Sequence, residues 1–493
     1  MKKRLSNKSV DYVQYLALGI ISILALLVRA INITKSSIWH DEGFSVMLAL
    51  RNPIQIWQGS ARDVHPPFYY ELLHCWMKLF GSSAIAVRSL SLMAGVLAVI
   101  VGFMVVKSIS TKRAAIISAL FLALAPIMVR YSQEARMYGL LTLLMLIALY
   151  AVINIVKKPN QIWPYVLYTL SIGLGLYTHY FTALAVISLW FYLVLLQSPK
   201  KWQLNKTIFL SLKWWLANIV ALLLFLPWLG NMVAQLTRGQ GLGWLGKTNI
   251  YSLGSALWQF VSFTDGKQLP MLLWWAVVII VIGASIYIVI KDESKQKFNL
   301  LIVIYSLLPI FLALAVSTFK PVFHERYFVF SAAGIFIILA LAIDKASNAR
   351  QWLLYALVFG VIIVEVIGVR NVYAQSNHQM QNVLSNLNTQ AKSGDIVIAG
   401  ELYVFFDGSY YNKSNLPIKL YTANSNLNGY GESGLLYDQN VYLNSYSTVP
   451  AGSRVWLIGK TGNQQYYNQV PPNWQLQQQV QAGYSELRLY QVK

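Results

Sequence analysis

The chain has 493 residues, of which 56% are apolar and only 12% charged, with a formal net charge of +21. Its single cysteine, Cys75, excludes an intramolecular disulfide framework and a multi-thiolate metal site. Repeated apolar runs are long enough to cross a hydrocarbon core of about 30 Å. The composition predicts a polytopic α-helical membrane protein, in which attraction to anionic lipid accounts for the positive charge without a nucleic-acid partner.

The apolar runs predict about 11 transmembrane helices. They lie at residues 13–33, 84–106, 114–129, 139–156, 163–177, 181–197, 207–229, 270–290, 298–319, 328–343 and 351–369. The first run is too long for the core of a signal peptide and lacks a small-residue cleavage site, so we expect it to be retained. No internal repeat of fixed period is present, which argues against the duplicated halves common in secondary transporters.

Basic residues gather in alternate connections between the predicted spans. They are Lys2, Lys3, Arg4, Lys8, Lys107, Lys112, Arg113, Lys157, Lys158, Lys200, Lys201, Lys206, Lys291, Lys295, Lys297, Lys345 and Arg350. The positive-inside rule makes these connections cytoplasmic. We therefore expect a multi-pass plasma-membrane protein with its amino terminus inside, and with a first outer loop at about residues 34–83 and everything after Arg370 outside.

After Val369 the composition changes to Asn, Gln, Ser, Gly and Tyr. We expect a membrane domain over residues 1–370 and a small extracytoplasmic α/β domain over residues 371–493. Within the latter, helical spacing is present at 380–387, and short strands are predicted at 395–399, 418–421, 455–458 and 487–490. The glutamine-rich stretch from Gln464 to Gln481 can bind a polymer or glycan, but a solvated, non-aggregating surface explains it more simply.

The first outer loop begins with Trp39-His40-Asp41-Glu42 and continues to Asp63-Val64-His65-Pro66-Pro67. The two prolines can begin a helix that Gly81 ends. A second amphipathic segment, 44–50, follows the acidic pair and is expected to end at Asn52 and Pro53. Both segments can lie in the plane of the membrane interface, so the acidic pair is expected at the level of the lipid headgroups.

Carboxylates are scarce on the outer side of the membrane half, so a general base must come from a short list that includes Asp41 and Glu42. Adjacent acids repel, and this repulsion either raises the pKa of one acid or requires cations or hydrogen bonds to both. The alternative is that the pair caps the following helix near its positive end. Capping and catalysis are compatible.

Cations and imidazoles occupy other outer connections. Arg130, Glu134 and Arg136 lie between two predicted spans, and His324, Glu325 and Arg326 lie between two others. The planar guanidinium group matches phosphate oxygens, although these arginines can also act as snorkelling anchors or ion-pair partners of Glu134 and Glu325. Histidines can orient a phosphate, shuttle a proton or bind metal, but no pair has the spacing of a zinc helix. These residues are expected to converge at one outer mouth.

At these residues the chain resembles glycosyltransferase family 39, the protein mannosyltransferase and aminoarabinose transferase-like branch of the membrane glycosyltransferase C superfamily. The matching features are Asp41-Glu42, His65-Pro66-Pro67, Gln133-Glu134-Ala135-Arg136-Met137-Tyr138, His179-Tyr180 and Glu325-Arg326-Tyr327, and they cover residues 1 to about 370. The chain departs from aminoarabinose transferases, which carry Glu-Lys-Pro at His65-Pro66-Pro67. It also lacks the β-trefoil domain of eukaryotic protein-directed members.

The resemblance implies an inverting transferase that moves a hexose or pentose from a polyprenyl-phosphate donor to an acceptor hydroxyl on a glycolipid, cell-wall polymer or protein. It makes Asp41 the catalytic base, supported by Glu42, and places Arg136 and Arg326 near the lipid phosphate. The substrate-binding candidates are His65, Arg130, Glu134, Arg136, Tyr138, His179, Tyr180, His324, Glu325, Arg326 and Tyr327.

One phosphate on the donor means that cationic side chains suffice without a cofactor or metal, although a divalent cation stays open. A transporter or flippase of lipid-linked sugars is the alternative from another class. Transporters usually place polar groups near the bilayer midplane, whereas here they cluster outside. A third possibility is a non-catalytic receptor that binds through its carboxy-terminal domain.

Overall fold

The computed structural model describes residues 2–196, 207–238, 245–249, 251–264, 271–347, 350–375, 379–423, 431–436 and 440–493. The chain divides into two compact units: unit 1 comprises residues 1–31, 89–232 and 242–374, and unit 2 comprises residues 32–88, 233–241 and 375–493. The first outer loop thus packs with the carboxy-terminal residues in unit 2. The boundary expected at residue 370 stays a prediction, and Lys200, Lys201 and Lys206 lie outside the described residues.

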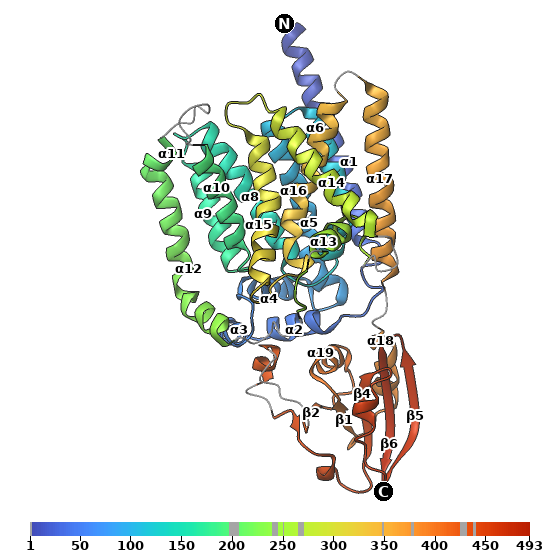
Figure 1. The fold of residues 1–493 in the computed structure, drawn as a ribbon. Helices are drawn as coiled ribbons and strands as arrows, with labels where there is room; N and C mark the ends of the chain where they lie inside the picture. Colours follow the sequence, from blue (N-terminus) through green and yellow to red (C-terminus); the bar gives the residue numbers. More distant parts are fainter. Residues whose placement is uncertain are drawn as a thin grey trace. The chain divides into compact units, whose positions relative to one another are not determined.

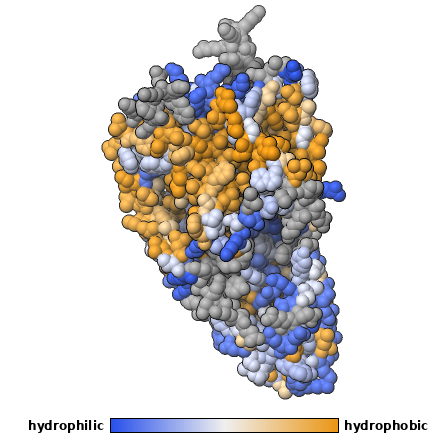
Figure 2. Space-filling view, viewed as in Figure 1, coloured by the Kyte–Doolittle hydropathy of each residue, from blue (hydrophilic) through white to orange (hydrophobic). Residues whose placement is uncertain are grey.

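Helices build the membrane half of the chain (Figure 1). They are α1 (Lys2–Ala30), α5 (Ala84–Ile109), α6 (Lys112–Leu124), α7 (Pro126–Ser132), α8 (Tyr138–Lys157), α9 (Trp163–Leu176), α10 (Thr182–Leu195), α11 (Thr207–Leu210), α12 (Leu212–Arg238), α13 (Ser252–Ser262), α14 (Met271–Ile290), α15 (Phe298–Ser317), η1 (Glu325–Phe328), α16 (Val329–Ala346) and α17 (Gln351–Ala374). At the centre, α16 packs against α6, α8, α14 and α15. By contrast, α1, α12, α14 and α17 are mostly unburied, and Figure 2 shows apolar side chains gathered over the helices of unit 1. Such a surface is suited to lipid.

Within the described residues, eight helices are long and apolar enough to cross a membrane, or nine if α6 and α7, bent by 55°, form one broken span. Every apolar run predicted from the sequence forms a helix. The predicted count of 11 is higher because α9 and α10 have only 14 residues each. At 1.5 Å per residue each is about 21 Å long, less than the hydrocarbon core. The prediction of a polytopic α-helical protein is confirmed.

Unit 2 contains the helices of the first outer loop and a small α/β domain. The helices are α2 (His40–Ala49), α3 (Pro53–Arg62), α4 (Phe68–Phe80), α18 (Met380–Gln390), α19 (Leu402–Tyr411), η3 (Gly431–Leu436), η4 (Tyr446–Thr448) and α20 (Gln464–Tyr467). Helix α4 follows Pro67 and ends at Gly81, whose φ of 80° suits glycine, as the sequence predicts. Helix α2 ends at Ala49, shortly before Asn52 and Pro53, as the sequence predicts. The Asn52 side chain accepts the Gln55 N–H at 3.0 Å and begins α3.

The sheet of unit 2 has six strands in the order β3-β2-β1-β4-β6-β5 among the residues that the structure describes. The strands are β1 (Ile396–Ala399), β2 (Ile418–Tyr421), β3 (Tyr442–Leu443), β4 (Arg454–Lys460), β5 (Trp474–Ala482) and β6 (Ser485–Val492). The pairs among β1 to β4 are parallel, whereas β6 runs antiparallel to both β4 and β5. The four predicted strands and the helix at 380–390 are confirmed, as is the α/β class of this domain.

Within unit 2, helix α2 packs closely against α19 of the α/β domain. A Cβ added at Gly43 would come within 2.8 Å of the Phe406 carbonyl oxygen, so the backbones touch where glycine stands. The rings of Phe44 and Phe406 meet edge to face at 5.5 Å. The Tyr411 hydroxyl accepts a hydrogen bond from the Ile38 N–H at 2.7 Å. These contacts fix the segment that carries the acidic pair.

Candidate active site

The acidic pair occupies the first turn of α2, where the free N–H groups of the helix favour negative charge. Asp41 is 4% exposed and Glu42 is fully buried. The Trp39 N–H donates to Glu42 Oε2 at 3.4 Å, so Glu42 helps to cap the helix. The helix begins before the acids, at His40, and includes them. Capping is thus one function of the pair.

Arg88, near the start of α5, pairs with Glu42 through both arms of its guanidinium group. Nε lies 2.7 Å from Glu42 Oε1, and Nη2 lies 2.5 Å from Glu42 Oε2. The same group donates to the carbonyls of Ser36 and Ser37 at 2.9 and 3.1 Å. A bidentate, buried pair of this kind fixes both position and charge. Sequence analysis missed Arg88; its signal was an arginine within an otherwise apolar run.

Asp41 has a different neighbour. His40 Nε2 lies 2.9 Å from Asp41 Oδ1, and the His40 ring packs against Tyr403 at 4.2 Å between centroids. The charge of Glu42 is balanced by Arg88, so the adjacent acids are not two uncompensated charges. This arrangement meets the expectation that cations or hydrogen bonds tether the pair.

A third acid lies near this pair. Asp407, on α19, is buried, and burial raises the pKa of its carboxyl well above its ordinary value. Lys460 opposes this rise, and Glu42 and Asp41 add to it. Its Oδ1 atom has no hydrogen-bond partner among the described residues. Burial therefore favours the protonated form of the Asp407 carboxyl. No sequence signal pointed to Asp407, because only the packing of α19 on α2 brings it there.

His65, the remaining predicted site residue of unit 2, faces an acid of its own loop. Its Nδ1 atom lies 3.2 Å from Asp63 Oδ2, and Asp63 is buried at the end of α3. The carboxylate orients the imidazole and favours a proton on Nδ1. The Nε2 atom is then the one suited to act on a ligand.

In unit 1, the partly exposed Arg130 of α7 forms an ion pair with the buried Glu134 in the segment before α8. The charges of Arg130, Glu134 and Arg326 all interact with the side chain of Tyr131. Arg136 is also buried, and its backbone carbonyl accepts a hydrogen bond from the Ser91 hydroxyl at 2.9 Å. The ion-pair alternative proposed for Arg130 is therefore correct. The cationic groups of α7 and η1 lie in one neighbourhood.

Aromatic rings line the same part of unit 1. Tyr327 lies 6.2 Å from Tyr138 and 5.2 Å from His179 between ring centroids. The Arg326 guanidinium group lies 5.8 Å from the centre of the Tyr138 ring and 5.6 Å from that of Tyr327. Cation–π contact of this kind holds an arginine in place while leaving its N–H edge for hydrogen bonding.

Three further candidates have local partners. His324 Nδ1 lies 3.3 Å from Glu325 Oε2, and its ring is 5.8 Å from Tyr327. Tyr180 accepts a hydrogen bond from Trp228 Nε1 at 2.9 Å. The structure thus brings Arg130, Glu134, Tyr138, His179, Arg326 and Tyr327 together in unit 1. Asp41, Glu42 and His65 belong to unit 2. The convergence of all of them at one outer mouth stays a prediction.

Among the residues that the structure describes, no group of three or more His, Cys, Asp or Glu side chains is placed to hold a metal ion. The expectation that no cofactor is required stays a prediction.

Comparison with known proteins identifies the class of fold. The family model described as dolichyl-phosphate-mannose-protein mannosyltransferase matches residues 64–230. This range includes the predicted site residues from His65 to Tyr180, whereas Asp41 and the segment from His324 to Tyr327 lie outside it. No curated protein sequence gives a significant match.

Solved structures share the architecture at low sequence identity. ArnT from Cupriavidus metallidurans in the apo state is 10% identical with a TM-score of 0.66, covering 98% of each chain. The same protein bound to undecaprenyl phosphate is 12% identical with a TM-score of 0.64, covering 95% of this chain and 97% of that one. The oligosaccharyltransferase AglB from Archaeoglobus fulgidus, in complex with an inhibitory peptide and a dolichol-phosphate, is 12% identical with a TM-score of 0.54, covering 91% and 69%.

The chain therefore shares its fold with ArnT, and the match over residues 64–230 agrees with the resemblance found in the sequence motifs. The chain is a multi-pass membrane protein.

Proposed function

We propose that the protein is an inverting glycosyltransferase that moves a sugar from a polyprenyl-phosphate donor to an acceptor hydroxyl at the outer face of the membrane. The observation that carries this proposal is the acidic pair of α2, in which Arg88 balances Glu42 and leaves Asp41 as the carboxylate for chemistry. The match over residues 64–230 and the shared fold support it.

In the proposed reaction, Asp41 accepts the proton of the acceptor hydroxyl as that oxygen bonds to the anomeric carbon. The bond between this carbon and the phosphate oxygen breaks on the opposite face, and the electron pair leaves with polyprenyl phosphate. One displacement inverts the centre. The transition state has oxocarbenium character, as in glycoside hydrolysis. Fixing donor and acceptor together supplies part of the acceleration.

Negative charge builds on the departing phosphate, and fixed cations stabilise it. Arg326 is the best-supported candidate because two aromatic rings hold its guanidinium group. Arg136 contributes a second charge, and His65 and His324 are the imidazoles that can donate to phosphate oxygens. Arg130 is paired with Glu134, so it positions that segment.

The proposal is tested with purified protein in lipid, supplied with a panel of polyprenyl-phosphate hexoses and pentoses and with glycolipid, glycan and peptide acceptors. Release of polyprenyl phosphate from one donor, with a glycoside of inverted anomeric configuration by NMR, is the expected result. Folded protein that releases no lipid phosphate from any donor, but moves lipid-linked sugar between the leaflets of vesicles, would establish a flippase.

The phosphate-binding assignment predicts that Arg136→Ala and Arg326→Ala each raise the donor KM about 10-fold to 100-fold, because a hydrogen bond to a charged group contributes about 1.5–3 kcal/mol. Steady-state kinetics with varied donor measures the effect. Arg350→Ala, which removes an exposed arginine beside α17, is the matched control. An unchanged donor KM in a folded variant rejects the phosphate contact at that position.

A further inference from the structure

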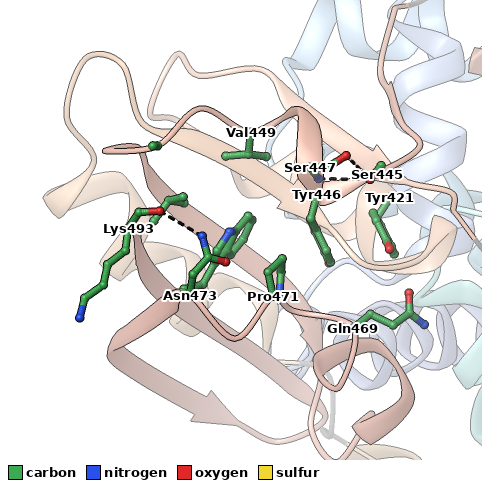
Figure 3. Close-up of a pocket in the computed structure, with 12 residues that line it drawn as sticks. Tyr421, Ser445, Tyr446, Ser447, Val449, Gln469, Pro471, Asn473 and Lys493 are labelled. Atoms are coloured by element: carbon green, nitrogen blue, oxygen red, sulfur yellow. Dashed lines mark hydrogen bonds between the residues drawn. The ribbon is translucent and has the colours of Figure 1, made fainter.

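A cavity of about 450 Å³ opens in the α/β domain, apart from the acidic pair of α2 (Figure 3). Its walls come from the end of β2, the segment around η4, and the turn that leads into β5. The volume lies within the range of about 300–1,000 Å³ that is typical of small-molecule sites. No residue assigned to the transfer reaction lines it, so this cavity needs a separate explanation.

Aromatic rings form one wall. Tyr421 and Tyr446 stack almost in parallel, with 4.1 Å between their ring centroids and 5° between their planes. Trp474 follows at 5.0 Å from Tyr446. Tyr446 and Trp474 belong to the buried core of the domain, whereas Tyr421 is only partly buried. The stack is therefore a rigid platform with one accessible member.

Polar groups accompany the rings. The hydroxyls of Ser445 and Ser447 lie 2.7 Å apart, and Asn473 Nδ2 donates to the Lys493 carbonyl at 3.0 Å, which fixes the amide. Figure 3 shows Tyr421 and Tyr446 side by side, with Gln469 and Asn473 also lining the pocket. The wall thus offers hydroxyl and amide groups, which both donate and accept hydrogen bonds.

This combination fits a neutral sugar. One face of a pyranose ring carries polarised C–H groups that pack on the electron-rich face of an aromatic ring, and its hydroxyls require both donors and acceptors. Lys493 carries the single charged side chain among the twelve residues that line the cavity, so the lining is mostly neutral. A purely apolar ligand would make no use of the hydrogen-bonding capacity of the amides and hydroxyls in this wall.

We propose that the cavity lined by Tyr421, Tyr446, Ser447, Gln469, Asn473 and Trp474 binds a neutral hexose unit of a glycan. This inference goes beyond the proposed function because binding requires neither the donor nor transfer. It also gives part of the glutamine-rich stretch a role in glycan binding, the alternative to a solvated surface. A glycan held there is retained by the unit that carries Asp41.

The test measures binding of neutral oligosaccharides of glucose, mannose and N-acetylglucosamine to the full chain in lipid nanodiscs without any donor, by calorimetry and by ligand-observed NMR. Wild type is expected to bind at least one of them, and Glu401→Gln, at an acid of the same unit outside the cavity, to bind it equally well. Tyr421→Ala should weaken that binding about tenfold through loss of the platform, while Tyr421→Phe keeps the ring and most of the affinity. Tyr484→Ala, at an exposed tyrosine in the same domain, is the matched control.

Three results would overturn the proposal. Folded wild type that binds none of the oligosaccharides excludes a neutral glycan site. Equal weakening by Tyr421→Ala and Tyr484→Ala places binding elsewhere. Stronger binding of an aromatic peptide than of any sugar assigns the cavity to a peptide. Because no donor is present, failure here leaves the transfer reaction untouched, and failure of transfer leaves this binding result standing.

Discussion

Individual side chains in unit 2 show how the protein stabilises two adjacent acids in a buried position. Arg88 forms a bidentate pair with Glu42, and backbone carbonyls accept its remaining donors. The neighbouring Asp41 has the imidazole of His40 close to its Oδ1 atom. We infer that the two acids have different roles. Glu42 fixes the first turn of α2, and Asp41 accepts the proton of the acceptor hydroxyl.

This division predicts that Arg88→Ala lowers the free energy of unfolding by about 3–5 kcal/mol, because it leaves Glu42 buried without its cation. Thermal and denaturant unfolding in detergent measures the change. Lys460→Ala removes an exposed partner of Glu401 and should cost about 1 kcal/mol or less. Equal effects of the two variants would show that the Arg88 pair contributes no more than a surface ion pair.

The raised pKa of the Asp407 carboxyl predicts that stability depends on pH. Burial raises the pKa of this carboxyl above its unfolded-state value, so between the two values the folded state binds a proton that the unfolded state has lost. Its contribution to stability is therefore full below the unfolded pKa and falls as pH rises toward the folded pKa. In Asp407→Asn this fall should disappear, and melting temperatures of both proteins from pH 4 to pH 8 measure it. Parallel curves would mean that Asp407 is ionised in the folded protein.

At the scale of elements, the packing of α2 on α19 determines where the acidic pair lies. Gly43 permits this packing because a Cβ there would meet the backbone of Phe406. Gly43→Ala should therefore destabilise unit 2 by about 1–3 kcal/mol through overpacking. The same change at Gly360, where a Cβ meets open space, is the control, and limited proteolysis with thermal unfolding reads the outcome. Equal stability of the two variants would contradict the close contact.

The elements also show what the sequence can and cannot predict. Helix α4 was predictable from Pro67 and Gly81, and the four buried strands from their apolar runs. Strand β5 was missed although Trp474, Leu476, Val480 and Ala482 follow the two-residue period of a strand, because the stretch was interpreted by its glutamine content. It lies at the sheet edge, where backbone pairing with β6 holds it and most of its side chains are exposed. Helix α19 was missed because Tyr403, Val404, Phe405 and Phe406 are residue types that are common in strands.

Some candidate site residues were predicted from the sequence, and others were not. Residue types and their order along the chain pointed to Asp41, Glu42, Arg136 and Arg326. Arg88 and the buried carboxyl of α19 depend on contacts between segments far apart in the sequence, which no local pattern records. Spacing along one chain predicts neighbours within an element but not the partner that an element meets.

Across the whole molecule, an apolar helical unit and a second unit of outer-loop helices and mixed sheet divide the work that we propose. Unit 1 supplies the lipid-facing helices and the cationic, aromatic cluster around Arg326. Unit 2 supplies the acidic pair and the aromatic cavity. We propose above all that Asp41, a carboxylate of unit 2, acts as the base in transfer from a lipid-phosphate donor.

The most direct test is the rate of polyprenyl-phosphate release at saturating donor and acceptor by wild type, Asp41→Asn and Glu401→Gln, an acid of the same unit outside the proposed site. We expect Asp41→Asn to lose about 10²-fold to 10⁴-fold or more in rate while it stays folded and still binds the donor. Glu401→Gln should retain nearly the wild-type rate. Turnover by folded Asp41→Asn within a few-fold of wild type would contradict the account and remove Asp41 from the mechanism.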